Sequence, residues 1–141
     1  AGGRDLDAAA ARAAIYGYAV GLDLTRRDLQ AQAKARGTPW DTAKGFDASA
    51  PIGAITPATQ CGHPDHGELR LDINGETRQR ADIATMVMKV TDILVSLSTY
   101  FELRAGDLLY TGTPAGVAAL QRGDVFVATF PGLADLRGRI V

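Results

Sequence analysis

The sequence of 141 residues contains a single cysteine, Cys61, so no disulfide can form within it. A lone thiol is typical of a reducing compartment, and we therefore expect a cytoplasmic protein. The sequence also lacks any run of about 18 apolar residues, the length that suggests a membrane span. The first residues contain no apolar stretch typical of a signal peptide. These features predict a protein without a membrane partner.

The chain has little excess of either charge, with 15 basic and 16 acidic residues and a formal net charge of -1. Its basic residues are scattered, whereas nucleic-acid-binding proteins gather them in a patch, so we expect no nucleic-acid partner. The composition, 46% hydrophobic and 22% charged, is that of one globular domain. A chain of this length can bury a core without disulfide or metal staples.

Histidine is scarce too, and both copies, His63 and His66, lie close to Cys61. Zinc sites use cysteine and histidine at short spacing, but they need three or four protein ligands. No second ligand pair is spaced to complete such a site, and the glycines and proline among these residues indicate a turn. We interpret residues 61–67 as a solvated loop rather than a metal site.

Residues 18–22 form an apolar run that ends in a single carboxylate, Asp23. Thr25, followed three places later by Asp28, matches a capping box, and a glycine after residue 36 predicts a helix end. We therefore expect a buried strand over residues 15–22 and a helix over residues 25–36. Asp23 would lie at their junction.

Several polar side chains of different chemistry fall near this junction. Arg27 and Gln30 are three residues apart and share a helix face, and Lys44 follows in a loop. A carboxylate, a guanidinium, an amide and an ammonium in one stretch predict a candidate anion and metal site. The alternatives are that Asp23 caps the helix, and that Arg27 and Lys44 are solvated or paired with neighbouring aspartates.

Residues 68–80 contain the clearest local pattern. Leu69, Leu71 and Ile73 alternate with polar residues, and Asn74-Gly75 is typical of a type I′ turn. We predict a β-hairpin with a structural role only.

Residues 83–101 have apolar side chains at helical spacing, which predicts an amphipathic helix beginning near Thr91 if residues 86–90 are extended. Met86 and Met88 are interpreted as packing residues. The other expected elements are a helix over 7–14, a loop over 37–57 with Phe46, Ile52 and Ile55 buried, and strands over 108–110, 125–130 and 133–141. Because helices do not alternate with every strand, the pattern predicts an α+β, mainly antiparallel architecture with helices on its faces.

Residues 111–116, Thr-Gly-Thr-Pro-Ala-Gly, follow the expected strand over 108–110. The hydroxyls and backbone amides of such a loop can hold an anion. No Gly-Lys-Ser/Thr follows, so this is not a Walker loop. An ordinary turn fits the pattern equally well.

Four stretches taken together resemble the fumarylacetoacetate hydrolase family, with the greatest likeness to acylpyruvate and fumarylpyruvate hydrolases. They are Gly-Tyr-Ala-Val-Gly-Leu-Asp-Leu-Thr-Arg-Arg-Asp-Leu-Gln at 17–30, Lys-Gly-Phe at 44–46, Asn-Gly-Glu-Thr-Arg-Gln at 74–79, and the segment 106–117. Each motif is weak alone, but their order and spacing make the joint match specific.

The resemblance implies a mixed, mainly antiparallel β-roll, a homodimer, and a bound Mg²⁺ or Mn²⁺. Family members cleave a C–C bond in 1,3-dicarbonyl acids, so the implied partner is a small diketo-acid substrate. By the same resemblance Asp23 is the metal ligand, and Arg27 and Gln30 contact substrate oxygens. Lys44 matches the lysine beside the metal, and Thr113 the threonine at the substrate's acid end. Gln30 and Lys44 would then be the catalytic hydrogen-bond donors.

In the family, two further metal carboxylates come from an upstream Glu-x-Glu, and a His/Glu pair that activates water lies earlier still. Neither is in this sequence, which opens on Ala1 without a methionine. We expect residues 1–141 to be a single catalytic-type domain that lacks its N-terminal part. The alternative is a relative that has lost its chemistry.

The prediction for function is therefore a metal-dependent hydrolase of acylpyruvates, with fumarylpyruvate split into fumarate and pyruvate and Mg²⁺ as the ion. Within the enzyme class, the alternative is an isomerase or oxaloacetate decarboxylase on the same fold. Outside it, the alternative is a non-catalytic domain that dimerises or binds a ligand.

Overall fold

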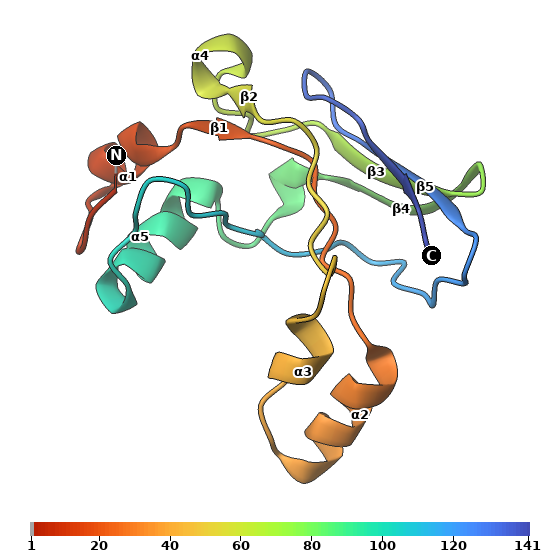
Figure 1. Cartoon of the computed structure of the whole chain (residues 1–141). Helices are drawn as coiled ribbons and strands as arrows, with labels where there is room; N and C mark the ends of the chain where they lie inside the picture. The colour runs from red at the N-terminus through yellow and green to blue at the C-terminus, as the bar shows by residue number, and fades with distance from the viewer. Residues whose placement is uncertain (1) are drawn as a thin grey trace.

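A computed structural model describes residues 2–141, and its strands form two antiparallel sheets (Figure 1). The smaller sheet pairs β1 (Gly17–Tyr18) with β2 (Thr56–Pro57). The larger sheet has the order β4-β3-β5-β6. Its strands are β3 (Glu68–Ile73), β4 (Glu76–Asp82), β5 (Val125–Thr129) and β6 (Leu136–Arg139). The helices are α1 (Ala8–Ala14), α2 (Arg27–Arg36), α3 (Asp41–Lys44), α4 (Ala58–Cys61), the 3₁₀ turn η1 (Ile83–Thr85) and α5 (Val90–Tyr100). The α+β, mainly antiparallel architecture is confirmed.

The core lies on one face of the larger sheet, where alternate side chains of the strands point inward. Its buried members are Val20, Ile73, Phe126, Ala128, Phe130 and Leu136. Val20 comes from the segment just before Asp23, so the core anchors the start of the candidate site to the sheet.

The predicted hairpin is present as β3 and β4. Asn74 and Gly75 have φ of 53° and 86°, the two positive values that a type I′ turn requires. The backbone amide of Val125 donates to Asn74 Oδ1 at 2.9 Å, which holds the turn against the start of β5. The hairpin is thereby joined to the third strand at its tip as well as along its length.

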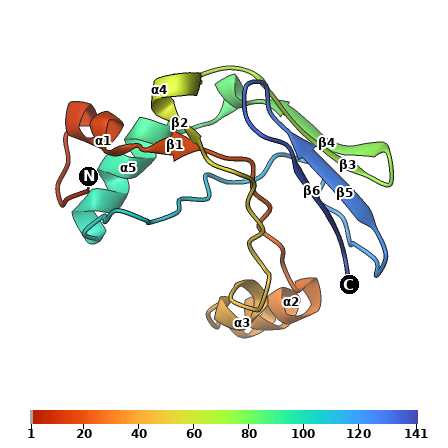
Figure 2. The same ribbon diagram turned by 45° about the horizontal axis from the view of Figure 1, so that its top comes forward.

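Two of the expected helices are also confirmed. Asp7 caps α1, its Oδ1 accepting from the Ala10 amide at 2.8 Å, and α5 begins at Val90, next to the predicted start. Figure 2 shows α1 and α5 lying side by side. Ser98 of α5 is fully buried and its Oγ accepts from the Leu6 amide at 2.9 Å, which fixes the N-terminal segment to α5.

The strand expected over residues 15–22 is wrong in length. Only Gly17–Tyr18 are strand, and the chain then forms irregular contacts with residues 49–53, including an isolated bridge between Gly21 and Ile52. Pro51 supplies a carbonyl to the Leu22 amide but has no N–H to donate in return. A regular ladder therefore cannot continue there.

The capping box is also wrong. The N-cap of α2 is Arg26, without a side-chain cap, and Thr25 Oγ1 instead donates to the Asp23 carbonyl at 3.4 Å. The end of the helix is as predicted, since Gly37 adopts the left-handed conformation with φ 63° and the Thr38 amide donates to Ala33 O at 2.9 Å.

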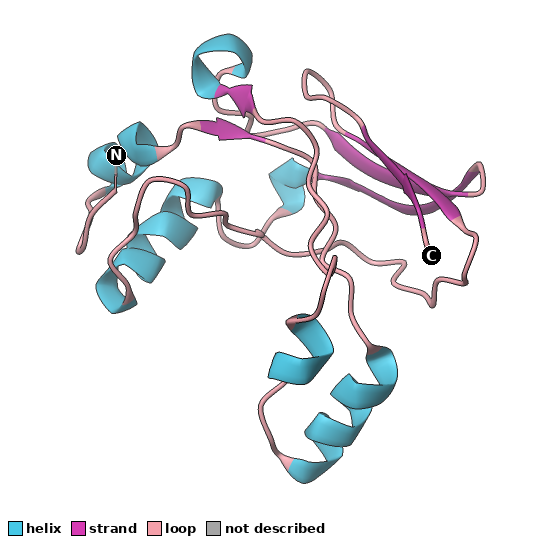
Figure 3. Ribbon diagram, viewed as in Figure 1, coloured by secondary structure: helices cyan, strands magenta, loops and turns pink. Residues whose placement is uncertain are grey.

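Three predictions are wrong: burial of Ile52 and Ile55, a strand over residues 108–110, and packing of Met88. In each case tertiary packing leaves the segment at the surface. Ile52 and Ile55 are 38% and 44% exposed, while Phe46 is half-buried beneath the Arg26 guanidinium, 4.4 Å from the ring centre. Residues 108–110 pair with no strand, and Figure 3 shows the whole connection from α5 to β5 as loop. Met88 is 43% exposed rather than packed.

Helices α2 and α3 form a projection that stands away from both sheets on two connecting segments (Figure 1). No residue of α2 is buried. The loop expected over residues 37–57 thus contains the short helix α3. This projection carries Arg27, Gln30 and Lys44, so its geometry decides whether the candidate site forms. No helix among residues 2–141 has the length and apolar character needed to cross a membrane.

Candidate active site

Asp23 and Lys44 form an ion pair at the base of the projection. Lys44 Nζ donates to Asp23 Oδ2 at 2.7 Å, from the last residue of α3 to the segment that precedes α2. The Arg26 amide donates to Ala43 O at 3.0 Å, which brings the two segments together. The Asp23 side chain is 49% exposed and that of Lys44 is 36% exposed. The carboxylate is therefore held by one partner and still open to a ligand.

This geometry excludes one alternative for each of these two residues. Asp23 does not cap α2, because the N-cap is Arg26, and its carboxylate faces Lys44. Lys44 pairs with Asp23 rather than with Asp47, the aspartate that follows it in the sequence.

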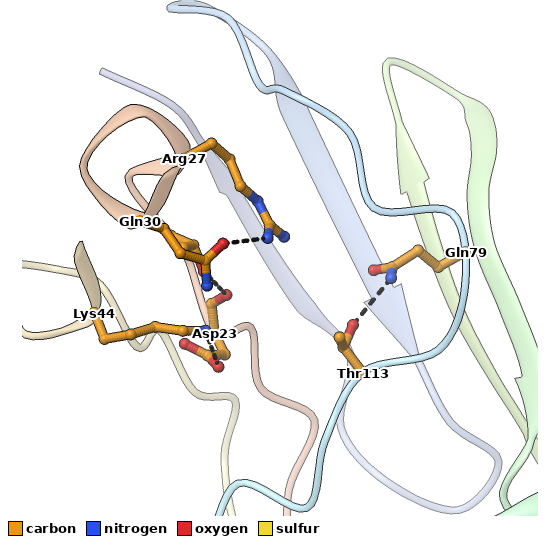
Figure 4. Close-up of polar contacts among 7 residues, drawn as sticks. Asp23, Arg27, Gln30, Lys44, Gln79 and Thr113 are labelled. Carbon is orange, nitrogen blue, oxygen red and sulfur yellow. Dashed lines mark hydrogen bonds and ion pairs between the residues drawn. The ribbon is translucent and has the colours of Figure 1, made fainter. Parts of the chain in front are cut away.

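Arg27 and Gln30 lie one helical turn apart on the same face of α2. Arg27 Nη1 donates to Gln30 Oε1 at 3.0 Å. Because the amide oxygen accepts this bond, the amide nitrogen of Gln30 is the end that can donate elsewhere. Figure 4 shows these two side chains beside the Asp23–Lys44 pair, so the structure gathers four of the five predicted site residues.

Tyr110 joins the loop at 111–116 to the Asp23 segment. Its hydroxyl donates to Ala50 O at 2.8 Å, and its ring lies against Gly21, where an added Cβ would be 2.8 Å from Tyr110 Cε1. Burial raises the pKa of Tyr110, and the nearby Asp23 charge raises that pKa further. Sequence reasoning missed this residue, and its only signal was an aromatic hydroxyl directly before Thr111.

Thr113 is the fifth predicted residue, and its hydroxyl contacts the hairpin. Gln79 Nε2 donates to Thr113 Oγ1 at 3.0 Å (Figure 4). The same nitrogen donates to Pro114 O at 2.8 Å. Among residues 2–141, no hydrogen bond links Thr113 directly to the Asp23 group. The hairpin, expected to be structural only, thus supplies the side chain that holds Thr113. Gln79 is a second residue that sequence reasoning did not single out.

A cleft of about 480 Å³ opens beside Thr113. Its walls are mainly apolar and come from the end of β4, from η1 and the residues after it, and from the loop at 111–114. Met86 and Met88 line it, so both methionines face this cleft instead of serving only as packing residues.

Cys61 is the last residue of α4 rather than part of the expected loop, and residues 62–67 connect it to β3. His63 Nδ1 lies 2.7 Å from the Tyr18 hydroxyl, and His66 Nδ1 lies 2.6 Å from Asp65 Oδ1. No group of three or more His, Cys, Asp or Glu within the part of the chain that the structure describes is placed to hold a metal ion. Within residues 2–141, therefore, Asp23 has no group of carboxylate, thiolate or imidazole partners placed to complete an ion site with it.

The fold is that of solved enzymes of known class. A crystal structure of fumarylpyruvate hydrolase from Pseudomonas aeruginosa in complex with Mn²⁺ and pyruvate matches 99% of this chain with a TM-score of 0.96 and 48% identity. The match covers 60% of that chain. Residues 2–141 also match the family described as fumarylacetoacetate (FAA) hydrolase C-terminal. The chain belongs to the fumarylacetoacetate hydrolase family, as its motifs predicted.

Curated relatives have more than one activity. The chain is 46% identical over 122 residues to oxaloacetate tautomerase YcgM of Escherichia coli (strain K12), covering 86% of this chain and 56% of the relative. It is 43% identical over 122 residues to fumarylpyruvate hydrolase of Ralstonia sp, covering 86% of this chain and 63% of the relative. The matched region thus amounts to less than two thirds of the length of either relative.

Proposed function

We propose that this chain carries part of the active site of a divalent-metal-dependent hydrolase that splits fumarylpyruvate into fumarate and pyruvate. The observation that carries the proposal is the solvent-exposed ion pair between Asp23 and Lys44, whose charged atoms lie 2.7 Å apart. It occurs in a chain 48% identical to a fumarylpyruvate hydrolase crystallised with Mn²⁺ and pyruvate. We further propose that residues 1–141 act as one catalytic-type domain whose site is completed by residues outside this stretch. A homodimer in the cytoplasm belongs to the same proposal.

The chemistry of Asp23 fits a hard divalent cation. Mg²⁺ and Mn²⁺ prefer oxygen ligands, and Mg²⁺ keeps several waters when few carboxylates are available. Lys44 occupies one carboxylate oxygen of Asp23, and the side chain is about half exposed. Asp23 is thus suited to be one ligand of a set completed by water, substrate and other carboxylates. When bound, such an ion polarises a carbonyl and stabilises negative charge developing on its oxygen.

The side chains of this chain have separate tasks in the reaction. Hydrolysis adds water to the acyl carbonyl and breaks the bond from that carbon to the methylene of the pyruvate part. The bonding electron pair leaves with the methylene as an enolate, which takes up a proton to give pyruvate. Lys44 and the amide nitrogen of Gln30 donate hydrogen bonds to the oxygen on which negative charge develops. Removing one such donor typically lowers kcat by about 10²–10³-fold.

Substrate orientation falls to Arg27 and Thr113. The planar guanidinium of Arg27 suits a carboxylate, and its bond to Gln30 at 3.0 Å restricts its rotation. Thr113 provides a hydroxyl from the opposite group of residues in Figure 4. Two attachment points on one acid end restrict the pose of the diketo-acid, which lowers the entropic part of the barrier.

A second candidate function is interconversion of enol and keto oxaloacetate, favoured by the 46% identity to an oxaloacetate tautomerase. This reaction moves a proton between carbon and oxygen and needs no added water. The same donors would serve it, so Asp23 and Lys44 do not discriminate the two. Decarboxylation of oxaloacetate is a third reaction that the same contacts to a keto-acid would allow. A non-catalytic ligand-binding role is the remaining alternative.

The test uses the intact protein that contains this chain, assayed with Mg²⁺ or Mn²⁺ and, separately, after EDTA treatment. Pyruvate formation from fumarylpyruvate, followed by coupling to lactate dehydrogenase and NADH, supports the hydrolase. Loss of enol-oxaloacetate absorbance without pyruvate supports the tautomerase, and pyruvate formed from oxaloacetate supports the decarboxylase. No metal-dependent turnover of either acid would refute all three enzymatic proposals and leave the ligand-binding role.

A further inference from the structure

Gln79 is a polar residue on the core-facing side of the larger sheet. It pairs with Leu71 across the hairpin and is half-buried, whereas Arg78 and Arg80 on either side are exposed. Its amide nitrogen is 2.8 Å from Pro114 O and 3.0 Å from Thr113 Oγ1. Gly116 lies so close to the Arg78 carbonyl that a Cβ would overlap it, so the loop is pressed onto β4 beside Gln79.

The carbonyl of Pro114 determines which end of the Gln79 amide faces the loop. A backbone carbonyl can only accept, so the group beside it must be the NH₂ and not the amide oxygen. The NH₂ has two hydrogens, and the second is available for Thr113 Oγ1. Thr113 is therefore an acceptor toward Gln79, and its own hydroxyl hydrogen is left to point elsewhere.

We propose that Gln79 is a positioning residue that fixes the Thr113 hydroxyl as a donor toward the carboxylate of the keto-acid substrate. The inference rests on the proposed function, because the group that receives the hydroxyl hydrogen is the substrate's acid end. A carboxylate offers only acceptor oxygens, so it matches a hydroxyl that already accepts from Gln79 and keeps its own hydrogen for donation. A hydroxyl without this constraint would have to reorient on binding.

Gln79→Glu tests the polarity because it keeps the shape and removes the donor. The carboxylate introduced by this substitution would accept the Thr113 hydroxyl hydrogen and so turn it away from the substrate. In the intact protein with Mn²⁺, we expect this variant to raise the KM for the keto-acid and the calorimetric Kd of pyruvate at least about tenfold, as for loss of a hydrogen bond to a charged group. We expect kcat to change less than about threefold.

Gln79→Met is the second variant, of similar size but with neither donor nor acceptor at the amide. It leaves the Thr113 hydroxyl free to rotate, so its effect on Kd should fall between wild type and Gln79→Glu. Gln60→Glu makes the same chemical change at an exposed position of α4 and should bind pyruvate like wild type. Thermal melts of all variants show whether each is folded.

The decisive comparison places both substitutions at Gln79 in a Thr113→Val background. If Gln79 acts through the Thr113 hydroxyl, neither substitution should weaken binding further there. An equal loss in both backgrounds, or Gln79→Glu binding like Gln60→Glu, would overturn this inference alone. A wild-type protein that neither turns over keto-acids nor binds pyruvate would overturn the proposed function, and this inference with it.

Discussion

Lys44 Nζ lies 2.7 Å from Asp23 Oδ2, although the two residues are 21 positions apart in the sequence, with all of α2 between them. Both side chains are more than a third exposed. Exposed ion pairs typically contribute about 0–1 kcal/mol to stability. The pair is therefore a weak contributor to folding, which allows its functional role to be tested separately.

Replacing Asp23 by Ala should abolish metal-dependent turnover in the intact protein while changing the free energy of unfolding by less than about 1 kcal/mol. The reason is that an exposed ion pair contributes little to folding, whereas the variant lacks the proposed metal ligand. Activity titrated with Mn²⁺ and urea unfolding measure the two effects. Asp135→Ala is the matched control, since that exposed carboxylate also pairs with a cation, Arg137, at 2.7 Å. Wild-type turnover in Asp23→Ala would refute the metal assignment.

Tyr110→Phe should lower stability by about 0.5–1.5 kcal/mol, because it removes the hydroxyl that donates to Ala50 O and keeps the ring over Gly21. We also expect a reduced kcat/KM, since this bond holds the loop at 111–116 against residues 49–51, which in turn accept hydrogen bonds from the amides on either side of Asp23. Urea denaturation and steady-state kinetics check both effects. Tyr100→Phe, at a position 73% exposed, should change neither quantity. A Tyr110→Phe protein with unchanged kinetics would show that the loop is held without this bond.

Gly116→Ala should destabilise the protein more than Gly123→Ala. Both glycines have positive φ, 98° and 95°, so both variants incur a similar backbone strain of about 1 kcal/mol. At Gly116 the new Cβ would also overlap the Arg78 carbonyl, whereas at Gly123 nothing lies within 4 Å. The difference between their unfolding free energies isolates the close contact between the loop and β4. Equal losses would mean that the loop can shift away from β4 at little cost.

The two histidines should affect stability in opposite directions below about pH 6.5. Burial, with a smaller effect from Arg12, lowers the pKa of His63, so folding favours its neutral form. Its contribution is complete above the unfolded pKa, near 6.5, and is lost as pH falls through the lower folded pKa. The Asp65 carboxylate raises the pKa of His66, whose contribution is complete below 6.5 and is lost as pH rises through its higher folded pKa.

Melting temperatures measured between pH 5 and 8 test these signs. His63→Gln should reduce the loss of stability on acidification, because the variant lacks the imidazole whose protonation the folded state disfavours. His66→Gln should steepen that loss. Identical pH profiles for the two variants would contradict the assignment.

Local sequence determined those elements whose residues act on their near neighbours. Asn-Gly favours two successive positive φ values, as Asn74 and Gly75 show at the hairpin turn. Asp7 accepts from a backbone amide only three residues ahead. The apolar period of α5 and the left-handed Gly37 are equally local. For the same reason Asp23 before the helix, the Arg27–Gln30 face and the Thr113 loop could be singled out from the sequence alone.

The tertiary structure decided which of these groups meet and which segments remain at the surface. Asp23 faces Lys44 only because the returning chain sets α3 against the base of α2, and Gln79 contacts Thr113, which lies 34 positions later in the sequence. Ile52 and Ile55 have the hydropathy of core residues, yet they are exposed because the core forms on the other sheet. The hydrophobicity and spacing of residues indicate which interactions each side chain can make. Which partner it contacts depends on how tertiary packing positions segments that are distant in the sequence.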